Sequence, residues 1–541
     1  MCGIWAIFGL GRQAARGLDS ALKISQRGPD LTRFESIPGF KDSYIGFHRL
    51  SIMDDAHGLA PVHVDKYPHL QVLTNGAIFN WKELGAKHGL QLQTSCNDEV
   101  ITHLLAEHGV QKTAQWLDGV FSFIAIDKEK KKIHLARDTF GVRPMFTMTT
   151  AEDQLMGVCS EAKGMIHLKH EKYNIQPFPP GCCATYDLDL SGKASLVEWG
   201  EYTHIGKTPE YGTNVQLKND DVKYNIRALL REAVRKRLMG SHRVGTFLSG
   251  GFDSSLVSAL VAQCTKESGI TNRIRTFTIG IEGSPDVAAA RTVASHIGSD
   301  HHEVMFTPNE GIKSLHDVIY ALESYDTATI RSSLGMYLVS KYISENTDTV
   351  VVFSGDGSDE VTQGYTHFNK APTAEDGDKE SRRLLKDLYL FDVLRGDRTT
   401  AAHGLEVRVP FLDIPFISYY LSLPASDRHP QDGIEKHLLR AAHDINGFLP
   451  PEILWKTKRD AFGPGASHLK PWFEILYRHV EQEVTDKDMR NAKDIFPDNT
   501  PKSKEAFFYR RVFEDFFPGH SHFVPYIWVP KWESHDETIP L

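Results

Sequence analysis

Residues 244–264, VGTFLSGGFDSSLVSALVAQC, join a short apolar run to a turn rich in glycine and serine and then to a second apolar segment. The first run is typical of a buried strand, and the apolar residues after Ser255 recur at the spacing of one helix face. Gly250 and Gly251 let the backbone approach a ligand closely, and the free N–H groups at a helix start attract anions. The stretch therefore predicts a strand, a loop that cradles a pyrophosphate and a helix.

The neighbouring sequence repeats this alternation of strands and helices. Residues 274–281 and 348–354 are β-branched or apolar runs that each lead into a polar loop, and residues 221–238 form a helical pattern behind Asp221 as a cap. Alternation of this kind predicts a parallel, doubly wound sheet with ligands at the carboxyl ends of its strands. From about residue 310 to 530 the pattern is mostly helical.

The first part of the chain has a different pattern. Short apolar runs separated by turns predict a β-rich layered domain, with helices over 97–109 and 109–117. Residues 205–220 are polar and rich in turn formers, which is typical of a linker. We therefore expect an α/β multidomain protein with domains at 1–204 and 221–541.

Composition narrows the class of protein. The chain has 541 residues, of which 41% are hydrophobic and 24% charged, with a formal net charge of -9; this is typical of a soluble globular protein with more than one core. No basic face predicts nucleic-acid binding, and neither a leader nor a membrane span is expected. The six cysteines lack CxxC spacing, so we expect reduced thiols and a cytoplasmic protein without structural zinc.

The glycine-rich loop lacks the lysine and the spacing of a Walker A motif. It resembles the PP-loop of the ATP pyrophosphatases, which split ATP between its α and β phosphates. The resemblance implies ATP as the nucleotide. We assign ATP binding to residues of three strand ends: Leu248, Ser249, Gly250, Gly251, Asp253, Ser254, Ser255, Ile279, Ser354 and Gly355.

Residues 349–360, TVVVFSGDGSDE, end a further strand in a tight acidic turn. Carboxylates opposite a phosphate cradle suit Mg²⁺, which neutralises the phosphates. Asp253 and Asp359 are the candidate ligands, and the alternative is a solvated acidic turn. Asp286 is either a further ligand or a helix cap.

The chain opens with MCGIWAIFG, residues 1–9, which places Cys2 behind the initiator methionine. Removal of Met1 would leave a free α-amine on Cys2, and an unperturbed amine with a pKa near 8 can serve as the general base for the thiol. The alternative is a small core cysteine, and the accompanying motifs decide between the two.

Five motifs follow in order: RGPD (27–30), GFHRLSI (46–52), TNGAIFN (74–80), RDTFGVRP (137–144) and SEAKGM (160–165). Together with the amino-terminal CGI they resemble the class II glutamine amidotransferases, and this resemblance implies an Ntn-type fold with helix-sheet-sheet-helix layers for the first domain. Joined to the PP-loop half, the whole chain resembles the glutamine-hydrolysing asparagine synthetase family. The similarity to the animal form rests on TTAAHGLEVRVPFLD (399–413), GIEKHLLR (433–440) and TPKSKEAFFYRRVFE (500–514).

The resemblance implies a division of labour. In the first half Cys2 attacks the side-chain amide of glutamine, Asn75 and the Gly76 N–H form an oxyanion hole, and Arg49 binds the substrate carboxylate. The remaining residues of the implied glutamine site are Leu50, Ile52, Asn97 and Asp98.

In the second half the resemblance implies that the aspartate side chain attacks the α-phosphorus of Mg-ATP. This step gives β-aspartyl-AMP and pyrophosphate, and ammonia then displaces AMP to make asparagine. Asp356, Arg331 and Lys458 are candidate catalytic residues, although Arg331 and Lys458 could also be ordinary surface bases. The resemblance also suggests a homodimer.

Two substitutions fall in the implied glutamine site. Relatives have a glutamate where this chain has Ala77, and an aspartate where it has Asn97. Losing two hydrogen bonds to the substrate ammonium could weaken glutamine binding by about 3 to 6 kcal/mol, or ~10² to 10⁴-fold. Asp98 could substitute through a one-residue shift, but an adjacent side chain normally points elsewhere, so we expect a poor glutaminase.

Two further departures lie in the synthetase half. Relatives read SGEGSDE where this chain has Asp356, and a side chain shortened by about 1 Å can cost ~10²-fold in rate. Residues 458–466, KRDAFGPGA, lack the serine-aspartate pair that relatives carry.

Three interpretations remain open from the sequence. The first is an asparagine synthetase that takes its nitrogen from glutamine or from free ammonia. The second is an amidotransferase with another donor or carboxylate acceptor, and the third is a catalytically weakened paralogue that binds nucleotide. Retention of Cys2, Arg49 and Asn75 speaks against the third, because a pure binding protein needs no oxyanion asparagine.

Overall fold

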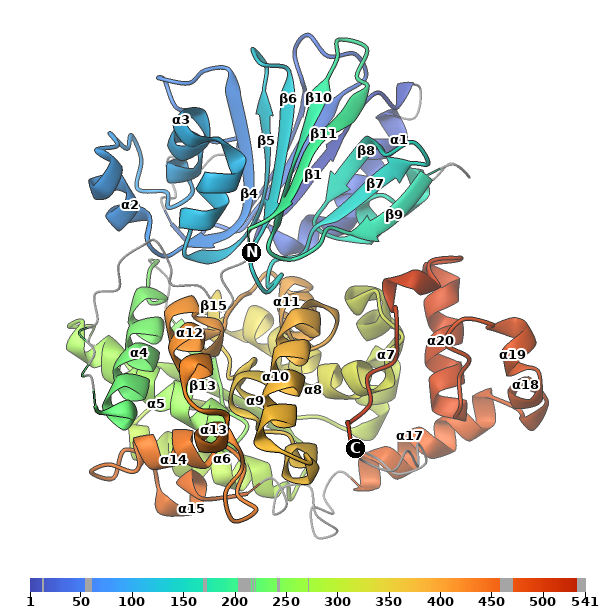
Figure 1. The fold of residues 1–541 in the computed structure, drawn as a ribbon. Helices are drawn as coiled ribbons and strands as arrows, with labels where there is room; N and C mark the ends of the chain where they lie inside the picture. The colour runs from blue at the N-terminus through green and yellow to red at the C-terminus, as the bar shows by residue number, and fades with distance from the viewer. Residues whose placement is uncertain are drawn as a thin grey trace. The chain divides into compact units, whose positions relative to one another are not determined.

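The computed structural model describes residues 1–11, 14–53, 61–168, 173–202, 216, 218, 220–240, 244–270, 272–457 and 470–532. The chain divides into two compact units (Figure 1). The first comprises Met1–Thr213, Met239–His242 and Ala401–Glu406, and the second comprises Asn214–Leu238, Arg243–Thr400 and Val407–Leu541. The predicted linker, 205–220, lies largely outside the described residues.

The first unit is built on one antiparallel sheet. Its described strands run in the spatial order β2-β3-β1-β8-β11-β10-β6-β5-β4, and β7 and β9 extend it from β8. In chain order these strands are β1 (Gly3–Ile7), β2 (Leu31–Ser36), β3 (Tyr44–Arg49), β4 (Leu70–Ile78), β5 (Gly119–Asp127), β6 (Lys132–Arg137), β7 (Phe146–Thr150), β8 (Gln154–Cys159), β9 (Tyr173–Pro177), β10 (Cys182–Leu188) and β11 (Ala194–Glu201).

This sheet curls on itself and carries a core on each face. Leu73 and Ile124 pack with Ile4 of β1 in one core. Alternate residues such as Val72 pack in the other core with Leu104 and its neighbours from α3 (Glu99–Trp116). Because β1 contacts β4 and β5 despite their distance in strand order, the sheet folds into two stacked layers.

Helices cover the outer faces of the stacked layers. Helix α3 packs on β4, α2 (Trp81–His88) packs on α3, and α1 (Ala14–Ala21) packs on β1 (Figure 1). The arrangement is a helix-sheet-sheet-helix layering, which agrees with the β-rich layered domain that the sequence predicts.

Helix α3 contains the break that the sequence predicts at Gly109. This residue has φ 77° and ψ 170°, a backbone conformation that favours glycine, and the helix changes direction there. The two predicted helices, 97–109 and 109–117, are therefore one helical segment with an interruption at their shared residue.

The second unit contains a five-stranded sheet among the described residues, in the order β14-β13-β12-β15-β16. The central pairs β12·β13, β12·β15 and β13·β14 are parallel. The strands are β12 (Val244–Phe247), β13 (Arg275–Gly280), β14 (Asp300–Met305), β15 (Val351–Phe353) and β16 (Glu406–Arg408). The predicted parallel sheet is confirmed.

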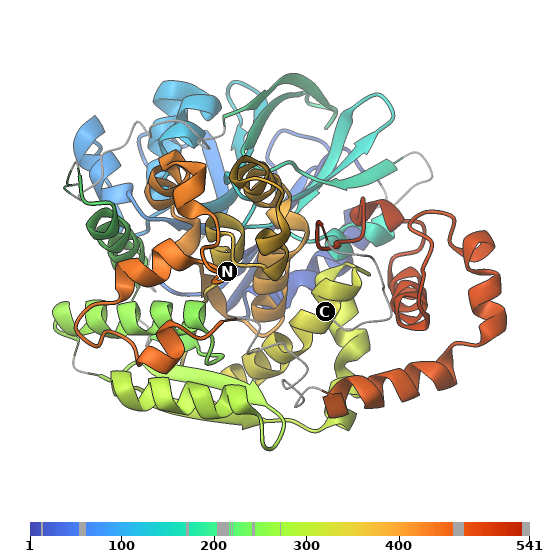
Figure 2. The ribbon, with the colours of Figure 1, turned by 60° about the horizontal axis from the view of Figure 1, so that its bottom comes forward.

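Helices surround this sheet. Helix α4 begins behind Asp221, whose carboxylate accepts a hydrogen bond of 2.8 Å from the Tyr224 N–H, as predicted for the cap. Near the carboxyl end, α17 and α20 pack on α7, and α20 also contacts α8 (Figure 2). The helices are α4 (Val222–Lys236), α5 (Phe252–Glu267), α6 (Pro285–Ile297), α7 (Pro308–Leu322), α8 (Thr327–Asn346), α9 (Ser358–Thr362), α10 (Ala374–Asp387), α11 (Asp392–Ala401), α12 (Ile414–Ser422), α13 (Ala425–Arg428), α14 (His437–His443), α15 (Pro451–Leu454), α17 (Lys470–Glu483), α18 (Asp486–Arg490), α19 (Ala492–Ile495) and α20 (Lys504–Phe516). Among the described helices, none has the length and apolarity needed to cross a membrane.

Asp138, in the RDTFGVRP motif, organises the turn after β6. Its buried carboxylate accepts hydrogen bonds from the N–H groups of Phe121, Phe140, Val142 and Arg143 at 2.9 to 3.2 Å. One carboxylate thus satisfies four backbone donors that would otherwise be buried without an acceptor.

Asp138→Ala should therefore destabilise the first unit. Each orphaned N–H costs about 1–3 kcal/mol, so we expect a loss of at least ~3 kcal/mol and a melting temperature lower by at least ~6 °C. Asp187→Ala is the control, because the Asp187 side chain on β10 is 62% exposed; it should shift the melting temperature by less than ~2 °C. Equal melting temperatures for both variants would contradict the structural role of Asp138.

Candidate functional site

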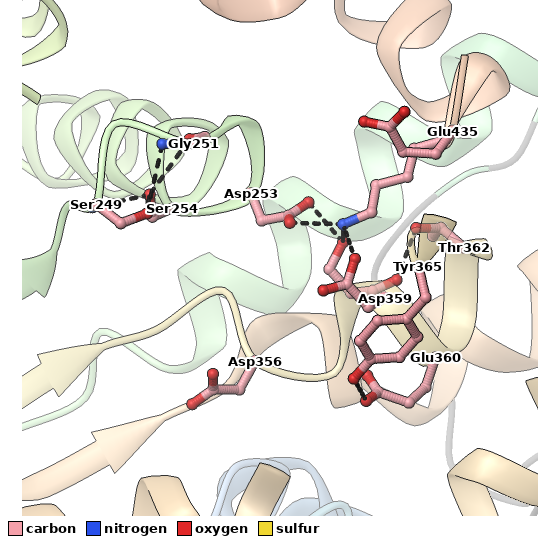
Figure 3. Close-up of polar contacts among 12 residues, drawn as sticks. Ser249, Gly251, Asp253, Ser254, Asp356, Asp359, Glu360, Thr362, Tyr365 and Glu435 are labelled. Carbon is pink, nitrogen blue, oxygen red and sulfur yellow. Dashed lines mark hydrogen bonds and ion pairs between the residues drawn. The ribbon is translucent and has the colours of Figure 1, made fainter. Parts of the chain in front are cut away.

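The predicted phosphate loop lies between β12 and α5. Ser249 and Ser254 contact each other through their hydroxyl oxygens at 2.9 Å, and the Ser254 hydroxyl also accepts from the Ser249 N–H at 3.1 Å (Figure 3). Ser254 Oγ in turn donates to the Gly251 carbonyl at 3.2 Å. This network fixes an open turn at the start of α5, where free N–H groups and the helix dipole favour an anion.

Gly250 is required by the shape of this turn. It has φ +80°, and a Cβ atom at this position would lie 2.6 Å from the Asp286 carbonyl oxygen and 2.8 Å from the Ala290 nitrogen. Gly251 has φ -79° and would place a Cβ in ordinary contact, 3.4 Å from the Ser249 hydroxyl. The two glycines therefore have different roles: Gly250 allows close packing on α6, and Gly251 is the N-cap of α5.

The loop after β15 approaches the phosphate loop at backbone distance. A Cβ atom on Gly355 would lie 3.0 Å from Asp253 Cβ and 3.1 Å from the Ser254 nitrogen. The preceding Ser354 is buried and donates its N–H to the Arg408 carbonyl at 2.9 Å. Two of the three strand ends that the sequence assigns to nucleotide binding, those of β12 and β15, are thus adjacent in the structure.

Asp253 and Asp359 face each other across this junction (Figure 3). The ammonium of Lys436 lies between them, 2.5 Å from Asp253 Oδ2 and 2.6 Å from Asp359 Oδ1. Ser358 donates its hydroxyl to Asp253 Oδ1 at 2.8 Å. A positive charge already occupies the position between the two predicted metal ligands.

This donor set fits a magnesium ion bound jointly with phosphates. Mg²⁺ is commonly held by one or two carboxylates together with substrate phosphate oxygens, and it rarely uses a complete protein cage. Within the described ranges no group of three or more His, Cys, Asp or Glu side chains is placed to hold a metal. The two carboxylates therefore suit a metal that arrives with a nucleotide.

Asp356 points away from this pair (Figure 3). Its Oδ1 accepts from Arg395 of α11 at 2.6 Å, whereas its buried Oδ2 lacks a hydrogen-bond partner among the described residues. Burial raises the pKa of Asp356, and the positive charge of Arg395 opposes that rise. The unpaired oxygen lies against Gly396, where a Cβ atom would be only 2.9 Å away.

Glu360, the next carboxylate of the acidic turn, contacts a tyrosine. The Tyr365 hydroxyl lies 2.5 Å from Glu360 Oε1 and 2.7 Å from Asp392 Oδ2. Burial and the nearby charge of Asp392 raise the pKa of Glu360 well above its ordinary value. Glu360 is thus part of a buried network beside the site.

The other predicted residues of this half differ in accessibility. Leu248 and Ser255 are fully buried, and Ile279 is partly exposed at the end of β13. Arg331 of α8 forms two hydrogen bonds with Glu505 of α20, at 2.8 and 2.6 Å. Lys458 lies outside the described residues.

The amino-terminal candidate site is centred on Cys2 at the start of β1. The Cys2 N–H donates to Asn75 Oδ1 at 3.1 Å, and its thiol lies 4.0 Å from the Leu50 carbonyl. Burial raises the pKa of the Cys2 thiol, so the thiol needs a base. The structure brings Cys2 and Asn75 together across β1 and β4.

Asn75 has a polar atom available for a ligand. The residue is fully buried, and its Nδ2 has no hydrogen-bond partner among the described residues. An unpaired buried amide donor costs free energy unless an acceptor binds it. The adjacent Gly76 has φ +144°, and a Cβ there would lie 2.0 Å from the Val120 carbonyl oxygen. The next residue, Ala77, contributes only a buried methyl group.

The RGPD motif supports Arg49. The Asp30 carboxylate accepts from the Ser51 N–H at 2.6 Å, and the Asp30 N–H donates to the Arg49 carbonyl at 3.0 Å. Gly28 packs so closely on this backbone that a Cβ would lie 2.2 Å from the His48 carbonyl oxygen. The buried Arg49 therefore ends β3 on a braced segment, followed by the buried Leu50 and Ile52.

Asn97 and Asp98 lie in different environments. Asn97 accepts the Ile78 N–H at 2.8 Å through Oδ1 and directs Nδ2 toward the Met53 sulfur at 3.1 Å. Burial raises the pKa of Asp98 to about 6, Glu99 adds to the rise, and the charge of Arg49 opposes it. Asp98 also acts electrostatically on Cys2. Asp98 thus interacts electrostatically with both Cys2 and Arg49, whereas Asn97 caps the end of β4.

Comparison with known proteins gives the family. A model of the asparagine synthase family matches residues 225–380 and 371–539, and a model of the glutamine amidotransferase domain matches residues 1–178. The chain is 50% identical to asparagine synthetase (glutamine-hydrolyzing) of Gallus gallus, over 98% of this chain and 96% of that protein. The chain belongs to the asparagine synthetase family. The proteins of the same name from Rattus norvegicus and Homo sapiens are each 49% identical to this family member over the same shares.

Sequence reasoning missed three polar residues of this family member. Lys436, Arg395 and Tyr365 contact the carboxylates of the synthetase half, yet none was singled out as a candidate. Lys436 lies in the GIEKHLLR motif that supports the family resemblance, which was the available signal. Its partner Asp253 is 183 residues away in the chain, so local spacing contains no sign of the contact.

Gly250→Ala should destabilise the second unit, whereas Gly251→Ala should be tolerated by the fold. A side chain at Gly250 would need a left-handed backbone and would collide with backbone atoms of α6, which costs at least ~2 kcal/mol. Thermal unfolding measures the difference, with Gly251→Ala as the matched control. Equal melting temperatures for the two variants would show that α6 moves aside without cost.

Proposed function

We propose that this chain makes asparagine from aspartate and ATP, using ammonia that it releases from glutamine. The observation that carries the proposal is the junction of the two glycine turns, which brings Asp253 and Asp359 together beside an anion-binding helix start. The family assignment supports the same activity, since relatives at about half identity are named asparagine synthetase (glutamine-hydrolyzing) over nearly their whole length.

In the amino-terminal half, the Cys2 sulfur attacks the side-chain amide carbon of glutamine. Removal of Met1 frees the Cys2 amine, which takes the thiol proton and passes it to the departing ammonia. Asn75 Nδ2 and the Gly76 N–H donate to the oxyanion; the unpaired state of Nδ2 supports this role. Water then hydrolyses the thioester and releases glutamate.

The Asp98 carboxylate binds the α-ammonium of glutamine, and Arg49 binds the α-carboxylate. Asn97 is engaged with the Ile78 backbone, so its replacement of an acid does not by itself remove the anion from the site. The electrostatic coupling of Asp98 to Cys2 and Arg49 supports this assignment. The glutaminase is therefore weakened by Ala77 more than by Asn97.

In the synthetase half, the loop from Ser249 to Ser254 binds the pyrophosphate part of ATP. A side-chain carboxylate oxygen of aspartate attacks the α-phosphorus, the bond to the β-phosphate oxygen breaks, and pyrophosphate leaves. Asp253 and Asp359 would hold Mg²⁺, which when bound neutralises charge on the phosphates. Ammonia then attacks the activated carbonyl, and AMP leaves with the oxygen that made the attack.

We propose that Asp356 Oδ2 accepts a proton during this second step. It is a buried acceptor without a partner among the described residues, and Arg395 holds its carboxyl group by the other oxygen. Burial raises the pKa of Asp356, which brings its basicity closer to that needed for proton transfer. Arg331 is held by Glu505 and stays a weaker candidate.

The two alternative interpretations are not favoured by the comparisons. Similarity at about half identity extends through both halves of the chain, which argues against a different donor or a pure binding role. A cytoplasmic location and a homodimer stay predictions. The six cysteines are free thiols, as a reducing compartment requires.

Cys2→Ala separates the two half-reactions. We expect the variant to lose asparagine formation from glutamine by at least ~10³-fold, because no nucleophile remains, while activity with ammonium chloride stays within about twofold. Pyrophosphate release and asparagine formation from aspartate and Mg-ATP are the measurements. Cys96→Ala is the control, because Cys96 is a buried thiol in the same unit. If the parent protein forms no asparagine with either nitrogen donor, the proposal is contradicted.

Asp98 should give glutamine binding a distinct pH dependence. In a Cys2→Ala background, glutamine affinity should fall about tenfold per pH unit below pH 6, because protonation removes the charge that binds the ammonium. Adding Asp98→Asn should make binding weak and flat from pH 5 to 7, whereas adding Asp187→Asn should change nothing. Calorimetry measures both. An unchanged pH profile in the Asp98→Asn protein would remove Asp98 from the site.

A further inference from the structure

Lys436 is a buried cation between two carboxylates of the proposed nucleotide site. Its side chain is 1% exposed, and its ammonium contacts Asp253 at 2.5 Å, Asp359 at 2.6 Å and the Ser358 hydroxyl at 3.2 Å. The group therefore has an oxygen partner in each of three directions. An ammonium donates three hydrogen bonds, so the cage matches its capacity.

The chain accepts backbone strain to place this ammonium. Lys436 has φ +58°, in the left-handed region that residues other than glycine seldom adopt, immediately before α14. Gly364 makes room for the lysine stem, because a Cβ there would overlap Lys436 Cε at 1.8 Å. The neighbouring Glu435 is paired with Arg440 at 2.7 Å and so does not compete for the ammonium. Strain of this kind is concentrated at functional positions.

The ammonium and a metal ion exclude each other from this position. Both would need the inward oxygens of Asp253 and Asp359, and Mg²⁺ requires oxygens at about 2.1 Å in near-octahedral geometry. With Lys436 in place the pair of carboxylates keeps one net negative charge, which attracts a free divalent ion much less than two would. A nucleotide changes this balance, because its phosphates offer the displaced ammonium a new anionic partner.

We propose that Lys436 is the resident counter-cation of the metal site, so that Mg²⁺ enters only together with the nucleotide. The inference rests on the proposed function for the identity of metal and nucleotide. Without nucleotide, Lys436 holds Asp253 and Asp359 at a spacing ready for a metal and keeps free divalent ions out. With nucleotide, the ammonium turns to a phosphate oxygen and the carboxylates accept the metal.

Binding of Mn²⁺ without nucleotide tests this role directly. Lys436→Met removes the charge and keeps most of the apolar stem, so free Mn²⁺ should bind the variant at least ~10-fold more tightly than the parent protein, because one charge-assisted competitor is gone. Lys436→Gln should show the same direction, and Lys436→Arg, which keeps the charge, should stay weak. Lys456→Met is the matched control, since Lys456 pairs with Asp286 at 3.7 Å and not with the carboxylate pair. Electron paramagnetic resonance of Mn²⁺ measures the free ion.

The outcomes separate this inference from the proposed function. If Lys436→Met and Lys436→Gln are folded by circular dichroism and bind free Mn²⁺ no more tightly than the parent, the counter-cation role is overturned even when the parent binds Mn-ATP. If the variants bind free Mn²⁺ tightly while the parent fails to bind Mn-ATP, the inference stands and the nucleotide assignment fails. Tight binding of free Mn²⁺ by the parent protein would also overturn it.

Discussion

The close approach of two glycine turns at the carboxyl ends of β12 and β15 is the constraint on which the synthetase half depends. Gly250 and Gly355 have no side chain at the points where backbone meets backbone. A methyl group on Gly355 would push the loop after β15 away from Asp253 and Ser254, and one on Gly250 would push the phosphate loop away from α6. Because the loops touch, Asp253 of one and Asp359 of the other share a single cation. Steric exclusion between backbones therefore determines the electrostatics of the site.

In the glutaminase half, too, a glycine lets two backbone segments pack closely at the site. Gly76 permits β4 to pass against Val120, and this brings Asn75 beside the Cys2 nitrogen. The Nδ2 donor of the buried Asn75 amide has no partner among the described residues, and a ligand oxygen that accepted from it would relieve the cost of burying it. Asp98 likewise has a pKa raised to about 6 by burial, a cost that a bound ammonium would offset. Among the described residues, Asn75 Nδ2 in the first unit and Asp356 Oδ2 in the second are buried polar atoms without a hydrogen-bond partner.

Local features of the fold could be predicted from the sequence because interactions between residues that are close in the sequence determine them. The cap at Asp221, the break at Gly109 and the strand-turn-helix from residue 244 all depend on neighbours within a few positions. The carboxylates Asp253 and Asp359 could also be inferred, because parallel strands end at one edge. Lys436 could not, since its position depends on tertiary packing around Gly364 and on an unusual backbone angle. The hydrogen bond from the Ile78 N–H to Asn97 could not be predicted for the same reason.

In the proposed reaction a carboxylate attacks the α-phosphorus of ATP at the junction of the two turns. The most direct measurement uses aspartate labelled with ¹⁸O in its side-chain carboxylate, together with Mg-ATP and ammonium, and mass spectrometry of the products. Attack on the α-phosphorus should place one heavy oxygen in AMP and none in pyrophosphate, because the attacking oxygen stays on the α-phosphorus when AMP leaves. Label in inorganic phosphate accompanied by ADP would contradict the account, since it would place the attack on the γ-phosphorus.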